Sequence, residues 1–233
     1  MILCIETATL VCSVALCDRN GVITLKESSE ERSHATQLTV FAGELLASEG
    51  IKANQLEAVA VSKGPGSYTG LRIGVSAAKG IAYGASVPLI GIETTRSMFF
   101  GLKEDFEHMY EPFTDTFFCP MIDARRMEVY YCIYDNEGNI TRNISAEVID
   151  SNSFRDIPAS TRLVFFGTGA SKCKKVIEHS NTIFIDDFNV SASFMYLPAY
   201  DALDEKKFED VAYFEPFYLK DFIATIPKKK IIG

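Results

Sequence analysis

The chain has 233 residues, 47% of them hydrophobic and 23% charged, a composition typical of a globular protein with one large domain or two smaller ones. Its formal net charge of −8 argues against unaided binding to a nucleic-acid backbone, which depends on clustered Lys and Arg. No stretch approaches the roughly 20 apolar residues of a membrane span, and no basic segment precedes the first apolar run. We therefore expect a cytoplasmic protein without a membrane contact.

Neither the cysteines nor the histidines form a metal-binding pattern. The six cysteines include no Cys-x-x-Cys pair, and the three histidines, His34, His108 and His179, are remote from one another. No His-x-x-x-His pair is present to bind zinc. We expect the cysteines to be buried thiols and predict no metal site.

The first half of the chain predicts three strands, a helix, a strand, a second helix and a strand. Asn20-Gly21 is a hairpin signal between the second and third strands. Ser33 is a plausible N-cap of the first helix, and Gly50 ends it. The predicted strands are 2–6, 12–18, 22–27, 59–62 and 87–92, and the predicted helices are 33–50 and 70–84.

The densest run of conformationally special residues lies between the fourth strand and the second helix. Gly64-Pro65-Gly66-Ser67 breaks the strand, and Ser67 or Thr69 can cap the helix that follows. With Gly70, the glycines are spaced G-x-G-x-x-x-G, which is neither a dinucleotide fingerprint nor a P-loop, and the segment is not a nucleophile elbow. An anion could still bind the free N–H groups at the start of the helix, and the sequence leaves this open.

Both predicted helices carry a face of small or apolar residues besides the face that a sheet would cover. A glycine inside a helix costs roughly 0.5–1 kcal/mol relative to alanine, so we expect the close approach of another backbone to compensate for it. That backbone belongs either to the same domain or to another chain. The candidate partner-facing residues are Thr36, Val40, Gly43 and Ala47 on the first helix and Gly70, Gly74, Ala77 and Ile81 on the second.

The second half of the chain repeats the pattern of the first. Residues 103–116 are acidic and aromatic without a clear period, and we predict that they link the halves. Two successive three-strand meanders, each followed by a helix and a strand, predict a duplicated βββαβ unit with α/β lobes over residues 1–103 and 117–233. The predicted strands are 117–122, 127–134, 139–148 and 163–166, with a short helix ending near 179 and a helical, aromatic segment after 191.

Five motifs are distributed over nearly the whole chain. They are Ile5-Glu6-Thr7-Ala8-Thr9, Gly64-Pro65-Gly66-Ser67-Tyr68-Thr69-Gly70-Leu71-Arg72-Ile73-Gly74, Asp123-Ala124-Arg125-Arg126-Met127-Glu128-Val129-Tyr130, Gly167-Thr168-Gly169 and Pro216-Phe217-Tyr218-Leu219. The second motif is highly specific, and the others have the order and spacing of one family. Together they resemble the TsaB family of bacterial tRNA threonylcarbamoyladenosine biosynthesis proteins, which implies the two-lobed fold of actin-like ATPases and sugar kinases.

The resemblance implies a cleft in which the first turn of each lobe faces a nucleotide. Glu6 and Thr7 would lie opposite Asp123, with Gly167 and Gly169 near the adenosine. The first turn has Thr7-Ala8 where a working member of the superfamily tends to have glycine, and it lacks a lysine. We therefore expect a vestigial cleft with no catalytic residue and no cofactor. In it, Glu6 and Asp123 would bind backbone N–H groups at strand ends.

The resemblance also implies a partner subunit instead of an enzyme. In that pathway TsaD transfers the threonylcarbamoyl group to the adenosine next to the anticodon, TsaE supplies an ATPase, and TsaB supports TsaD. We expect a heterodimer with TsaD, TsaE in a larger complex, a homodimer when the chain is alone, and tRNA contact only through the complex.

The alternative is an active enzyme of the same fold. A small ATPase or phosphotransferase would use Glu6 and Asp123 as functional carboxylates, although the chain lacks the glycines and the lysine that hold phosphates. A peptidase would need a metal pair or a Ser/His/Asp arrangement that the spacing does not support. Nucleotide hydrolysis by the pure chain would distinguish the ATPase from the partner subunit.

Overall fold

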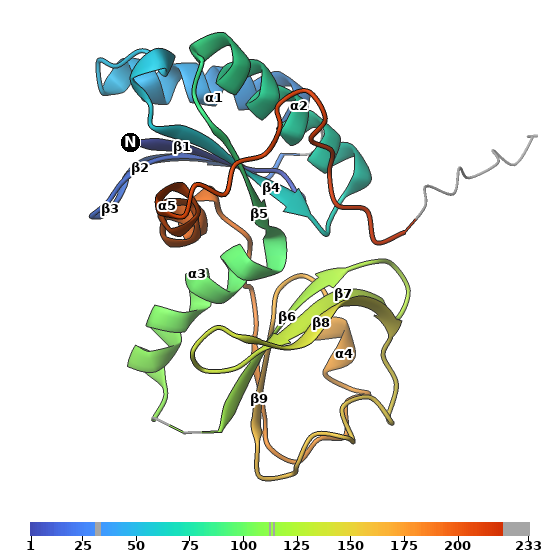
Figure 1. Ribbon diagram of the computed structural model, residues 1–233. Coiled ribbons are helices and arrows are strands. Elements are labelled where there is room, and N and C mark those ends of the chain that lie inside the picture. The colour runs from blue at the N-terminus through green and yellow to red at the C-terminus, as the bar shows by residue number, and fades with distance from the viewer. Residues whose placement is uncertain (31–33, 112, 114, 221–233) are drawn as a thin grey trace, which may run out of the picture.

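The computed structural model describes residues 1–30, 34–111, 113 and 115–220, and it has two lobes, one above the other in Figure 1. Each lobe contains a five-stranded sheet, and the strand orders are β3-β2-β1-β4-β5 and β8-β7-β6-β9-β10. In both sheets the first three strands pair antiparallel and the later strands are added in parallel. Two successive stretches of sequence thus form two sheets of the same topology, which confirms the predicted duplicated α/β fold.

The N-terminal lobe contains the elements predicted for the first half of the chain. Helices α1 and α2 cover one face of the sheet (Figure 1). The Ser67 hydroxyl accepts a hydrogen bond from the Gly70 N–H at 3.2 Å and so caps α2, whereas Ser33, the predicted cap of α1, lies outside the described residues. The elements are β1 (Ile2–Glu6), β2 (Cys12–Asp18), β3 (Gly21–Ser28), α1 (His34–Ser48), the short helical turn η1 (Ala53–Gln55), β4 (Ala58–Gly64), α2 (Tyr68–Ala85) and β5 (Leu89–Glu93).

The C-terminal lobe contains a sheet of the same topology as the N-terminal sheet, but fewer of its residues are helical. Turns over residues 151–156 stand where the N-terminal lobe has α1, and α4 has only four residues. Strand β10 was not predicted, because its four half-buried residues at the sheet edge are too few to form a pattern. The elements are β6 (Thr116–Asp123), β7 (Glu128–Tyr134), β8 (Ile140–Val148), β9 (Arg162–Phe166), α4 (Ala170–Cys173) and β10 (Thr182–Ile185).

A helix connects the lobes where a link was predicted. α3 (Thr94–Met109) includes the first half of the predicted link 103–116, for which no helix was predicted. Met98, Phe99, Leu102 and Phe106 form the buried stripe of α3 and belong to a core shared with the C-terminal sheet. Among the residues that the structure describes, no helix is both long and apolar enough to cross a membrane.

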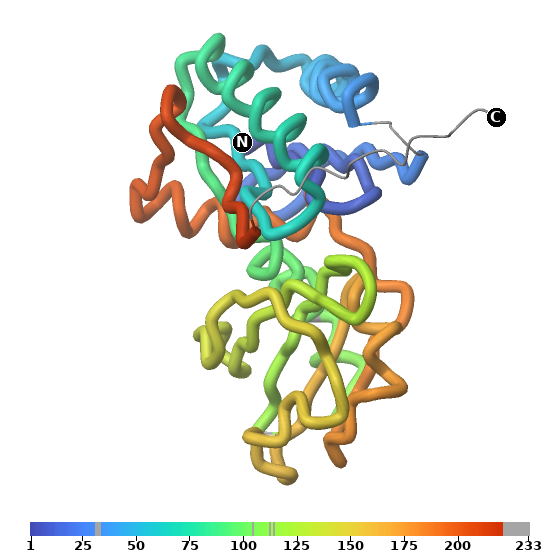
Figure 2. The backbone as a smooth tube through the Cα atoms, turned by 90° about the vertical axis from the view of Figure 1, so that its right-hand side faces the viewer, coloured from blue at the N-terminus to red at the C-terminus, as the bar shows by residue number. Residues whose placement is uncertain are grey.

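The end of the described chain returns to the N-terminal lobe. The turn η2 (Ala192–Met195) and helix α5 (Tyr196–Asp204) pack on the second face of the N-terminal sheet. Residues 209–218, here called the strap, then run along the same lobe, as the red segment in Figure 2 shows. The range predicted for the C-terminal lobe, 117–233, therefore includes residues that pack on the other lobe.

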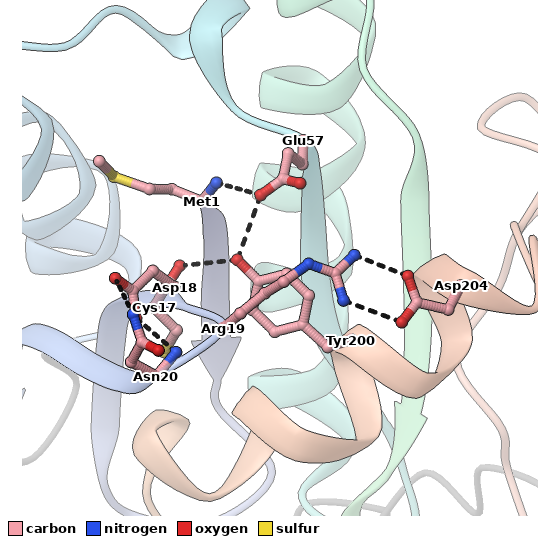
Figure 3. Close-up of polar contacts among 8 residues, drawn as sticks. All are labelled: Met1, Cys17, Asp18, Arg19, Asn20, Glu57, Tyr200 and Asp204. Carbon is pink, nitrogen blue, oxygen red and sulfur yellow. Dashed lines mark hydrogen bonds and ion pairs between the residues drawn. The ribbon is translucent and has the colours of Figure 1, made fainter.

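A polar network joins α5 to the N-terminal sheet where β2 ends and β4 begins (Figure 3). Arg19, in the β2–β3 turn, forms two hydrogen bonds with the Asp204 carboxylate at 2.9 and 2.6 Å, and its guanidinium lies 4.8 Å from the centre of the Tyr200 ring. The Tyr200 hydroxyl lies 3.2 Å from a Glu57 carboxylate oxygen and 3.3 Å from the Cys17 carbonyl oxygen. Burial and the nearby carboxylate raise the pKa of Tyr200, so its hydroxyl stays protonated and can donate.

Candidate functional site

Glu6, at the carboxyl end of β1, is fully buried. Its Oε1 accepts hydrogen bonds from the Ala8 N–H at 2.6 Å and from the Ser62 hydroxyl at 2.8 Å. Its Oε2 has no partner among the described residues. Burial raises the pKa of Glu6 to about 7, because the charged form is poorly solvated there. The structure thus places Glu6 on a backbone N–H of its own turn, as the sequence suggested.

The glycines at the start of α2 pack on the turn that follows β1. A Cβ added at Gly66 would lie 2.4 Å from the Ala8 carbonyl oxygen, and one at Gly70 would lie 2.1 Å from that of Thr7. A Cβ at Gly74 would lie 2.1 Å from the Thr7 hydroxyl oxygen. Such distances are too short for any side chain, so these three glycines are explained by close packing within the chain.

This packing changes the predicted partner-facing set. Gly70 and Gly74 are buried against Thr7 and cannot meet another chain, because the β1–β2 turn already occupies that side of α2. Ala77 and Ile81 are half-buried against the core of the N-terminal lobe. The α2 part of the predicted set therefore faces mainly its own chain.

Asp123 makes, in the second lobe, the same local contact as Glu6 in the first. Its Oδ1 accepts a hydrogen bond from the Arg125 N–H at 2.8 Å, and its N–H donates to the Thr168 hydroxyl at 3.1 Å. Oδ1 also pairs with the Lys172 ammonium, which donates to the Glu128 carbonyl oxygen at 2.7 Å. Lys172, which the sequence had not marked, thus supplies a positive charge beside this carboxylate from within the chain.

Gly167 and Gly169 are also explained by contacts within the chain. A Cβ at Gly167 would lie 2.5 Å from the Met121 carbonyl oxygen, and one at Gly169 would lie 2.9 Å from a methyl carbon of Val129. The backbone φ of Gly167 is 96°, which glycine adopts most readily.

The cleft residues therefore do not fit a working nucleotide and metal site. Glu6, Asp123 and the glycines bind their own chain, and α4, with four residues, is too short to offer a full helix dipole to a phosphate. Within the described ranges, no group of three or more His, Cys, Asp and Glu side chains could hold a metal ion. A pocket of about 490 Å³ lies beside the strap instead, between Lys63, Glu93 and Tyr218, and none of the predicted cleft residues lines it.

The outer sides of α1 and α2 are open. Val40 is 51% exposed and Tyr83 is 80% exposed, high values for large apolar side chains. A Cβ added at Gly43, Gly80 or Gly84 would meet nothing within 4 Å. We call this surface the outer face; it consists of Thr36, Val40, Gly43 and Ala47 of α1 and Gly80, Tyr83 and Gly84 of α2, all exposed.

Gly80 and Gly84 were missing from the predicted set, although the sequence contained a signal for them. Gly84 lies on the same side of the α2 wheel as Gly70. The β1–β2 turn covers that side only at the start of the helix, so the early glycines are buried and the late ones are exposed.

Comparisons with known proteins agree with this fold. A family model described as "TsaD: tRNA N6-adenosine threonylcarbamoyltransferase" matches residues 27–228. The "tRNA threonylcarbamoyladenosine biosynthesis protein TsaB" of Escherichia coli (strain K12) is 31% identical over 238 residues, which cover 100% of this chain and 98% of that protein. The chain belongs to the TsaB family. The resemblance read from the five motifs is thereby confirmed.

Further comparisons found another relative by sequence and two solved structures with a similar fold. The protein of the same name from Bacillus subtilis (strain 168) is 27% identical over 184 residues, 76% of this chain and 75% of that protein. The solved structure titled "YeaZ from Pseudomonas aeruginosa" matches with a TM-score of 0.77 at 22% identity, covering 94% of this chain and 99% of that one. A second structure, of an uncharacterized protein with similarity to peptidase YEAZ from Pseudomonas aeruginosa, has a TM-score of 0.80 at 21% identity over the same shares. These structures share the fold of this TsaB-family chain.

Proposed function

We propose that this chain is a non-catalytic partner subunit of a TsaD-type threonylcarbamoyltransferase and acts with it in the biosynthesis of tRNA threonylcarbamoyladenosine. The names of its relatives and the match to the TsaD family model support this pathway. The observation that carries the partner role is the presence of three solvent-facing glycines on α1 and α2, Gly43, Gly80 and Gly84.

These glycines are unfavourable in the isolated chain. Each costs roughly 0.5–1 kcal/mol relative to alanine inside a helix, so the three together cost about 1.5–3 kcal/mol. Close packing on the β1–β2 turn compensates for Gly70 and Gly74, but no part of the described chain approaches the other three. The close approach of a second backbone, which a Cβ would prevent, compensates for this cost in a complex.

The partner that fits this surface presents a similar pair of helices. Both α1 and α2 lie in one layer over the sheet (Figure 1), so their outer sides form one surface. A TsaD-type chain is expected to have corresponding helices, because the TsaD family model matches most of this chain. Two such pairs related by a two-fold or pseudo-two-fold axis would form a four-helix contact. The same surface would form a homodimer in the absence of the partner, and TsaE and tRNA would join only the larger complex.

The non-catalytic part of the proposal rests on the contacts of Glu6 and Asp123. Glu6 is buried with its Oε1 bound to Ala8 and Ser62, and the Asp123 carboxylate is paired with Lys172. These contacts within the chain support structural roles for both carboxylates, rather than the positioning of a metal-bound phosphate. The purified chain should therefore hydrolyse no ATP.

Sedimentation of the chain alone and with the TsaD-type protein of the same organism tests the partner role. Ala47→Arg and Gly80→Leu place bulk on the outer face and should weaken both the homodimer and the mixed complex at least tenfold. Ser160→Arg, at an exposed site on the other lobe, is the matched control and should associate normally. Unchanged association of the two outer-face variants would show that the interface lies elsewhere. The proposed partner role would be contradicted if reconstituted tRNA modification proceeded without this chain. The proposed absence of catalysis would be contradicted if this chain alone hydrolysed ATP.

A further inference from the structure

The strap is firmly attached to the N-terminal lobe. The Lys79 ammonium donates hydrogen bonds to the carbonyl oxygens of Ala212 and Phe214 at 3.2 and 2.9 Å, and the Phe214 side chain is buried in the core. The Phe217 N–H donates to the Lys63 carbonyl oxygen at 2.7 Å. A Cβ at Gly64 would lie 2.7 Å from the Phe217 carbonyl oxygen, so the strap lies directly on the end of β4.

The last residue of the strap, Tyr218, contacts the start of α2. The Tyr218 ring lies 5.0 Å from the Tyr68 ring, centre to centre. The Arg72 guanidinium lies 4.5 Å from the Tyr68 ring centre, and its Nε donates to the Tyr218 hydroxyl at 3.2 Å. These contacts hold Tyr218 at the first turns of α2.

Two residues later the chain touches the other lobe. The Lys220 ammonium pairs with the Glu128 carboxylate at the start of β7. The backbone of Glu128 accepts from Lys172, the partner of Asp123, so Lys220 is joined to the turn that carries Asp123. In Figure 1 the red strap descends beside α2 and ends above β7, on the other side of the view from the outer end of α3.

We propose that residues 218–220 are a latch that holds the two lobes together across the side opposite the outer end of α3. The lobes are joined covalently by α3 and by the segment between β10 and η2, and the latch adds a non-covalent third connection. Separation of the lobes at the ends of β4 and β7 requires that Lys220 leave Glu128 or that Tyr218 leave Arg72 and Tyr68. The latch is independent of the partner role, because it acts in the isolated chain.

The contacts of the latch suit a reversible connection. The side chains of Lys220 and Glu128 are 45% and 21% exposed, and an ion pair at such a surface is weak and is screened by salt. The strap before it is attached by buried and backbone contacts, which remain when the ion pair breaks. Loss of the ion pair therefore releases Lys220 from Glu128, while residues 209–217 of the strap stay in place.

Distance measurement between the lobes tests the latch. Spin labels on Thr39→Cys of α1 and Ser160→Cys of the C-terminal lobe are both at exposed sites, and all six native cysteines are buried. Double electron–electron resonance of the full chain then reports the fraction with separated lobes. Lys220→Gln and Glu128→Gln should each raise the ratio of open to closed molecules by about two- to fivefold, the effect of losing one exposed ion pair.

Three comparisons make the result decisive. The double variant should open no further than either single variant, because both remove the same contact. Salt at about 1 M should open the wild type to the same extent and leave the variants unchanged. Lys207→Gln, which removes an exposed ion pair with Glu205 on the same lobe, should have no effect. Distance distributions identical to the wild type in Lys220→Gln and in Tyr218→Ala, with melting curves showing both folded, would overturn the latch.

Discussion

Replacement of Glu6 by glutamine tests whether this buried carboxyl is held in its neutral form. The pKa of Glu6 is raised from an ordinary value of 4.5 to about 7 by burial. Between these two values the folded chain keeps the proton and the unfolded chain releases it. The free energy of unfolding of the wild type should therefore fall as pH rises from about 4.5 to about 7 and change no further through Glu6 above that.

The size of this fall follows from the raised pKa. Each pKa unit corresponds to about 1.4 kcal/mol, so a rise from 4.5 to about 7 gives about 3.5 kcal/mol of stability that the wild type loses and Glu6→Gln does not. For a chain of this size, that difference corresponds to about 7–14 °C in Tm. In the Glu6→Gln variant, the amide oxygen can still accept hydrogen bonds from the Ala8 N–H and the Ser62 hydroxyl. If burying the amide N–H groups lowers the free energy of unfolding, it does so equally at every pH.

The assay is urea unfolding of both proteins at several values between about pH 4.5 and about pH 8.5, with the difference in unfolding free energy plotted against pH. Asp123→Asn is the matched control, because it makes the same carboxylate-to-amide change in the corresponding turn of the other lobe at a side chain that is 49% exposed. This control should retain the fall that depends on Glu6. Parallel curves for the wild type and Glu6→Gln would refute the reasoning and show that a group able to stabilise the charge reaches Oε2.

Other substitutions probe the two kinds of glycine and the α5 network. Gly74→Ala should destabilise the chain by about 1–3 kcal/mol because its Cβ meets the Thr7 hydroxyl, whereas Gly80→Ala should stabilise it by about 0.5–1 kcal/mol. Thermal melts of both give the two signs, and equal signs would contradict the assigned packing. Gly80→Leu should combine an unimpaired monomer melt with weaker association in sedimentation. Tyr200→Phe keeps the ring beside Arg19 but loses the hydroxyl contacts, so urea unfolding should show a loss of about 0.5–1.5 kcal/mol; no loss would mean that those contacts contribute nothing.

The sequence predicted most of the N-terminal lobe because its local signals agree with its tertiary environment. The bounds of β1 and β2 were predicted as they are observed, since continuous apolar runs end at turn residues. The helical structure of residues 103–109 was not predicted, because acidic residues on the exposed side of α3 obscured an apolar stripe that faces the C-terminal sheet. β10 failed because a four-residue edge strand has too few residues for a period to be seen.

The candidate site could be predicted only where a contact is local. Glu6 with Ala8 and Asp123 with Arg125 are contacts between residues two apart, and the turn sequences were sufficient to suggest them. Lys172 lies 49 residues from Asp123, and no local pattern could have joined the two.

By itself, the sequence determined the duplicated fold and the family, because strands, turns and motifs can be recognised from residues that are close together in the sequence. The tertiary structure decided which neighbour each residue meets. The sequence does not distinguish a glycine of α2 that packs against the β1–β2 turn, such as Gly74, from one that faces solvent, such as Gly80. Likewise, the sequence indicated an aromatic segment after residue 191, but only the tertiary structure showed that it returns to α2 and that Lys220 then contacts Glu128 of the other lobe. Local patterns report that a residue is buried or special, and the three-dimensional path of the chain determines what it packs against.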